Sequence, residues 1–65
     1  MKLKTFWFEY SVVEYDVGYV VVRSSWLPFM PDKYINFKKE LVNTPWLFRD
    51  SVVASRTMMR YVLGT

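Results

Sequence analysis

Residues 3–24 read LKTFWFEYSVVEYDVGYVVVRS, and this stretch decides the fold. Large apolar side chains alternate with more polar ones from Lys4 to Val12, which is the period of a strand. The side chains of the predicted core face are Phe6, Phe8, Tyr10 and Val12. Trp7 falls on the opposite face, where the core of a monomer would not cover it.

A second predicted strand, Tyr19 to Arg23, is apolar on both faces, which is typical of a strand buried on both sides. Residues 14–18 between the strands contain Asp16 and Gly18, and both residue types favour turns. We expect a bulge or a wider loop here, because five residues exceed the tightest hairpin connection. The stretch therefore predicts a β-hairpin over residues 3–24.

The size and composition of the chain limit how it is stabilised. A domain of 65 residues buries only about 60% of the surface of its unfolded chain. There are 0 cysteines and 0 histidines, so disulfides and the usual zinc sites are excluded, and we expect oligomerisation or a partner instead. Aromatic residues make up 20% of the chain, more than one small core can hold, so some rings must lie at the surface or in an interface.

Residues 24–31, SSWLPFMP, predict a loop because of their prolines, although the loop carries Trp26, Leu27, Phe29 and Met30. One interpretation, which we favour, is that these side chains fold inward and close the open end of the core. The other is a contact loop that presents aromatic side chains to a partner.

Residues 31–43 predict a helix. Pro31 and Asp32 suit its first turn. Tyr34, Phe37 and Leu41 then recur at the spacing of one apolar stripe.

Residues 52–63 fit two structures. As a helix, the segment would be capped by Ser51 and ended by Gly64. We choose a strand, because β-branched and aromatic residues favour it and a two-stranded hairpin needs a third strand. Arg56 and Arg60 share a face under either interpretation, because a spacing of four suits both periods.

The expected fold is a single α+β domain over residues 1–65, with a three-stranded antiparallel sheet and one helix packed on one face. Its order is β-β-α-β, with the hairpin at 3–24, the helix at 31–43 and the C-terminal strand at 52–63. The alternative is a β-β-α-α order with a C-terminal helix.

Catalytic chemistry has little support in the sequence. Histidine is absent, the acidic residues are scattered, and 2 glycines cannot form a phosphate-binding loop. We therefore expect no enzyme activity, no metal and no cofactor. No apolar run approaches the roughly 20 residues of a membrane span, so we expect no membrane association and a cytoplasmic protein.

One helix can cover only one face of the sheet, so the other face should stay apolar and be covered by a second copy of the chain or by another protein. The expected contact residues are Trp7, Tyr19, Val21, Arg23, Trp26, Phe29, Arg56, Met58 and Arg60. The predicted function is a non-catalytic protein-binding module that forms a homodimer or blocks the surface of another protein, in the manner of an inhibitor or adaptor. Small proteins encoded by viruses and mobile elements have this general profile. The net charge of +3 supports an alternative, a single-stranded nucleic-acid-binding protein that uses aromatic and basic side chains on its sheet.

Overall fold

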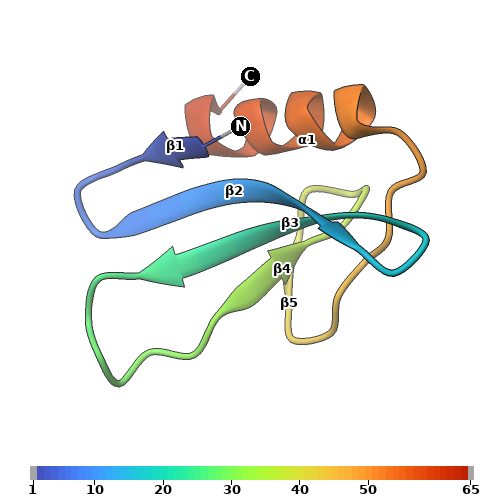
Figure 1. Cartoon of the computed structure of the whole chain (residues 1–65). Coiled ribbons are helices and arrows are strands. Elements are labelled where there is room, and N and C mark those ends of the chain that lie inside the picture. Colours follow the sequence, from blue (N-terminus) through green and yellow to red (C-terminus); the bar gives the residue numbers. More distant parts are fainter. Residues whose placement is uncertain (1, 65) are drawn as a thin grey trace.

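A computed structural model describes residues 2–64, which form an antiparallel sheet and one helix in two layers (Figure 1). The five strands follow one another in sequence order across the sheet. The helix α1 lies over one face and packs on the second and third strands. The elements are β1 (Lys2–Lys4), β2 (Phe8–Tyr15), β3 (Gly18–Ser25), β4 (Lys33–Ile35), β5 (Leu41–Val42) and α1 (Ser51–Leu63).

The predicted hairpin corresponds to β2 and β3, but the expected wide turn is wrong. Tyr15 pairs with Gly18, so Asp16 and Val17 alone connect the strands. The turn closes this tightly because Asp16 adopts a left-handed conformation with φ of 54°, which aspartate tolerates better than most residues.

Gly18 is required by a close approach rather than by the turn. A Cβ atom at this position would lie 2.6 Å from the carbonyl oxygen of Phe48. That approach lets Tyr19 and Phe48 exchange two backbone hydrogen bonds, of 2.8 and 2.7 Å. The segment that leads into the helix is thereby joined to the sheet beside β3.

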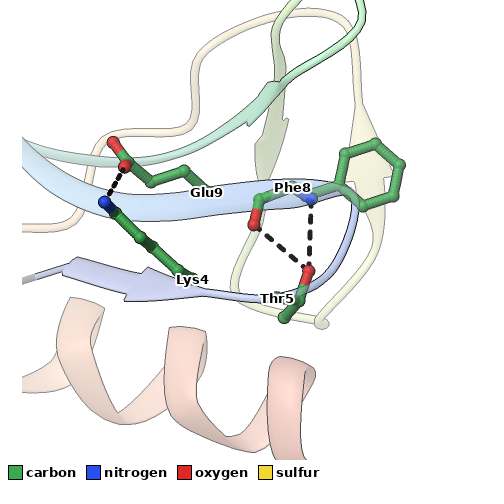
Figure 2. Close-up of polar contacts among 4 residues, drawn as sticks. All are labelled: Lys4, Thr5, Phe8 and Glu9. Carbon is green, nitrogen blue, oxygen red and sulfur yellow. Dashed lines mark hydrogen bonds and ion pairs between the residues drawn. The ribbon is translucent and has the colours of Figure 1, made fainter.

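The predicted strand at residues 4–12 is interrupted by a second tight turn. The Thr5 hydroxyl accepts the N–H of Phe8 at 3.2 Å and donates to the Phe8 carbonyl at 3.1 Å (Figure 2). Lys4 pairs with Glu9 in the ladder, and their side chains form an ion pair of 3.9 Å. Phe6 is therefore a turn residue that is 82% exposed, and its assignment to the core is wrong.

The predicted helix at residues 31–43 is also wrong, because the segment forms β4, a turn and β5. The Asn36 side-chain oxygen accepts the N–H groups of Lys38 and Glu40, at 3.0 and 2.9 Å. Lys39 takes a φ of 60° and donates its N–H to the Asn36 carbonyl. Such local bonds from asparagine compete with helix formation, and here they stabilise a turn in spite of the apolar residues at helical spacing.

Residues 52–63 form the helix that we ranked second, so the predicted C-terminal strand is wrong. Asp50, rather than Ser51, caps its start by accepting the N–H of Val52 at 2.8 Å. Gly64 ends it with a φ of 74° and a bond from its N–H to the Arg60 carbonyl. The sheet gains its further strands from β1, β4 and β5, so the fold is α+β with five strands instead of three.

The core lies between α1 and the sheet. Its buried side chains are Tyr10, Val21, Ile35, Phe48, Ala54 and Met58. Val12 pairs with Val21, so this part of β3 faces the helix together with the predicted core face of β2. The register therefore places Val21 in the core instead of on an uncovered face.

Candidate functional site

An exposed aromatic surface lies where two connections meet at one end of the sheet. The β1–β2 turn and the β3–β4 loop lie at the same end, away from the β2–β3 turn (Figure 1). The Trp26 N–H donates to the Trp7 carbonyl at 3.2 Å and joins the two connections. We call this surface the aromatic tip, and it consists of Phe6, Trp7, Trp26, Leu27, Phe29 and Met30.

Local contacts hold the aromatic tip in a defined shape. The rings of Phe6 and Trp7 pack edge to face with centroids 4.5 Å apart. The Ser25 hydroxyl accepts the Leu27 N–H at 3.0 Å, and this bond supports the start of the β3–β4 loop. The Phe29 side chain is 95% exposed, so the loop presents it to solvent and does not close the core.

The nine predicted contact residues separate into three regions. Trp7, Trp26 and Phe29 lie in the aromatic tip, whereas Arg56 and Arg60 lie on the helix. The remaining four belong to the interior between the sheet and the helix: Val21 of β3 and Met58 of α1 are fully buried, Arg23 is nearly so, and Tyr19 packs against the core.

Phe6 was assigned to the core, so its place in the tip was missed. Leu27 and Met30 were placed in the loop that the prolines predict, but they were not among the predicted contact residues. For Phe6, the only local signal was Thr5, whose hydroxyl can bond backbone groups in a turn.

Arg23 is a buried cation beneath the sheet end that carries the aromatic tip. Its guanidinium carbon lies 4.4 Å from the centroid of the Phe8 ring, and the side chain is only 7% exposed. Among residues 2–64, the buried Nε finds no hydrogen-bond partner. Stacking on the ring therefore replaces the carboxylate that such a cation usually requires.

Tyr10 pairs with Arg23 across the ladder, and burial raises the pKa of its phenol. The neighbouring Tyr61, whose ring centroid is 5.9 Å away, also raises this pKa, and Arg23 partly opposes the shift. The neutral phenol is thus the form that the folded chain prefers.

A second surface feature, which we call the basic hollow, lies between α1 and the β4–β5 turn. It has a volume of about 270 Å³. Its lining residues are Phe37, Lys39, Val53, Arg56, Thr57 and Arg60. Three of its six lining side chains are cations, so it is suited to an anionic ligand.

Within residues 2–64, no three acidic, histidine or cysteine side chains gather as a metal site would require. In the same part of the chain, no helix has the length and apolar character needed to cross a membrane. Comparison with known proteins found no matching family model, no matching curated protein and no matching solved structure.

Proposed function

We propose that the chain is a non-catalytic protein-binding module, and that the aromatic tip is the surface through which it contacts a second copy of itself or another protein. The observation that carries this proposal is the exposure of two phenylalanine rings, Phe6 at 82% and Phe29 at 95%. Large rings held in water by tight turns contribute nothing to the core. They would bury their apolar surface in a partner.

The composition of the aromatic tip also favours a protein partner. Tryptophan, phenylalanine and methionine are enriched at the centres of protein interfaces. Lys4 lies beside the tip with its ammonium 5.4 Å from the centroid of the Trp26 ring, so the rim is polar. A domain of this kind would act as an inhibitor or adaptor does, by occupying the surface of its partner. We place it in the cytoplasm, because a chain without cysteine suits a reducing compartment.

The proposal is tested by placing a photocrosslinking amino acid, p-benzoylphenylalanine, at position 29 or at position 17. Val17 is the matched control, because it is 85% exposed in the turn at the other end of the sheet. We expect crosslinked adducts at position 29 and not at position 17. The purified protein would show a dimer, and cells of the native host would show any other partner.

The self-association arm has a separate measurement. Sedimentation velocity over a range of concentrations should show association of the native chain and of Val17→Ser, but not of Phe29→Ser. Equal crosslinking at the two positions, or none at either in both the purified protein and host cells, would reject the aromatic tip as a contact surface.

A further inference from the structure

We propose that the basic hollow binds one nucleotide unit, with its cations on the phosphate and Phe37 against the base. Nucleotide chemistry could reach the site as a free mononucleotide or as one residue of a single strand. This inference is independent of the aromatic tip, since the two surfaces share no residue.

The helical wall of the hollow carries positive charge that no carboxylate of residues 2–64 pairs with. Arg56 and Arg60 are four positions apart, so they occupy one side of α1 as like charges and weaken the helix slightly. The helix itself contains no acidic residue over Ser51–Leu63. Among the described residues, neither arginine has a carboxylate within ion-pair distance, because the one ion pair joins Lys4 and Glu9.

The opposite wall is a hydrogen-bonded turn whose backbone places a third cation, Lys39, at the hollow. Asn36 bonds the backbone of the turn through its side chain, and the Lys39 N–H donates to the Asn36 carbonyl at 2.9 Å. The nearest acidic residue in sequence, Glu40, is directed to Asn36, whose side-chain nitrogen donates to it at 3.1 Å. Glu40 does not line the hollow, and none of the described residues that line it is acidic.

The hollow also has an aromatic surface beside its cations. Phe37 lines it and is 55% exposed, and its ring lies 4.8 Å from the ring of Trp46 at a tilt of 36°. Trp46 packs beside Phe37, the Lys38 ammonium lies 5.7 Å from the centroid of the Phe37 ring, and about half of Phe37 remains exposed. An exposed ring beside unpaired arginines is the combination that stacks a base and binds its phosphate. The volume of about 270 Å³ is near the lower end of small-ligand pockets, which suits one nucleotide rather than several.

The site differs from the predicted nucleic-acid surface, which was the sheet. Tyr19 and Arg23 belong to the covered face of the sheet, and only Arg56 and Arg60 of the expected basic contacts remain accessible. Stacking is assigned to Phe37 instead, a residue that the sequence had placed in the stripe of a helix.

The test is fluorescence anisotropy of a labelled 15-nucleotide oligothymidylate at low salt, with thymidine monophosphate, thymidine and inorganic phosphate as competitors. We expect the oligonucleotide to bind and the monophosphate to compete better than thymidine or phosphate alone. If the monophosphate binds as tightly as the oligonucleotide, the ligand is a free nucleotide. If the oligonucleotide binds far more tightly, the ligand is a single strand.

Charge variants distinguish the hollow from general electrostatic attraction. Arg56→Gln/Arg60→Gln should weaken oligonucleotide binding roughly tenfold or more and flatten its salt dependence. Lys2→Gln/Arg49→Gln is the matched control, because it removes two exposed cations that lie outside the hollow. Its net charge equals that of Arg56→Gln/Arg60→Gln. Phe37→Ala should weaken the binding of the oligonucleotide and of the monophosphate, but not the binding of inorganic phosphate.

Equal loss of affinity in the two double variants would overturn the proposal, as would the absence of any binding at low salt. Circular dichroism of each variant should match that of the native chain, which checks that the variant is folded. Arg56→Gln/Arg60→Gln should associate with itself as the native chain does in sedimentation velocity. A failure of the nucleotide proposal is therefore distinguishable from a failure of the proposal that the aromatic tip is a contact surface.

Discussion

Arg23 shows how a single residue can be retained in a core without an ion pair. Its aliphatic stem is buried, its guanidinium lies against Phe8, and its Nε has no hydrogen-bond partner in the part of the chain that the structure describes. A buried charge without a counter-ion is costly, so its packing volume rather than its charge should stabilise the fold.

We therefore expect Arg23→Met to leave the free energy of unfolding within about 1 kcal/mol of the native value or to raise it. Arg23→Ala should lower it by about 2–4 kcal/mol, because it leaves a cavity beside Phe8. Urea unfolding followed by tryptophan fluorescence measures both. A methionine variant as unstable as the alanine variant would show that the charge itself is needed.

Tyr10 connects the stability of the core to alkaline pH. Below its ordinary pKa of about 10.0 the phenol is neutral in both the folded and unfolded chain. Because the folded pKa is raised, the unfolded chain loses the proton first as pH increases. The free energy of unfolding should therefore fall above about pH 10 until the folded pKa is passed.

Tyr10→Phe should reduce this alkaline loss, measured by urea unfolding at about pH 8, 10 and 11. Tyr15→Phe is the control, since it removes an exposed tyrosine of the same strand instead of a buried one. The idea fails if Tyr10→Phe and the native chain decline in parallel.

At the scale of elements, the N-cap of α1 is Asp50, one residue before the predicted cap Ser51. Asp50→Ala should lower the free energy of unfolding by about 1 kcal/mol, because the N–H of Val52 then loses its acceptor. Ser51→Ala should change it by less than about 0.5 kcal/mol, and Asp50→Asn should retain most of the native stability. Chemical denaturation of the three variants decides this, and a larger loss for Ser51→Ala would assign the cap to Ser51.

The elements that were predicted correctly are β3 and the part of β2 that follows the Thr5 turn, where the apolar pattern matches the strand. Tyr10 and Val12 indicated the core face of β2, and the β2–β3 hairpin follows directly from such positions. The helix at residues 31–43 was predicted wrongly because Tyr34, Phe37 and Leu41 fit a helical stripe as well as two short strands. Only the side-chain bonds of Asn36 decide between these structures, and periodicity does not report them.

The candidate site was partly predictable for a related reason. The alternation predicted that Trp7 would be uncovered, but Trp7 is exposed for a different reason, because it lies in the turn between β1 and β2. The spacing of Arg56 and Arg60 predicted a shared face, and both residues line the basic hollow. The basic hollow itself was not predictable, because it needs the β4–β5 turn beside the helix. The burial of Val21 and Met58 depends on strand register and on α1, which no short stretch of sequence specifies.

For the whole molecule, self-association through the aromatic tip would add to the stability of a small core. Binding between folded copies raises the apparent stability by mass action. The thermal unfolding midpoint of the native chain should therefore rise with protein concentration, and that of Val17→Ser should do the same. Phe29→Ser should have a midpoint independent of concentration in differential scanning calorimetry. A midpoint that is constant for the native chain would contradict self-association.

The two outer strands of the sheet are very short, with three residues in β1 and two in β5. They offer little unpaired backbone to which an incoming strand could be added, and Lys2 and Lys4 put positive charge on the first of them. Fibril-like stacking of copies edge to edge is disfavoured for the same reason, in spite of the many apolar residues. Both proposed binding surfaces accordingly consist of side chains that project from turns and from the helix, and neither proposal requires an extension of the sheet.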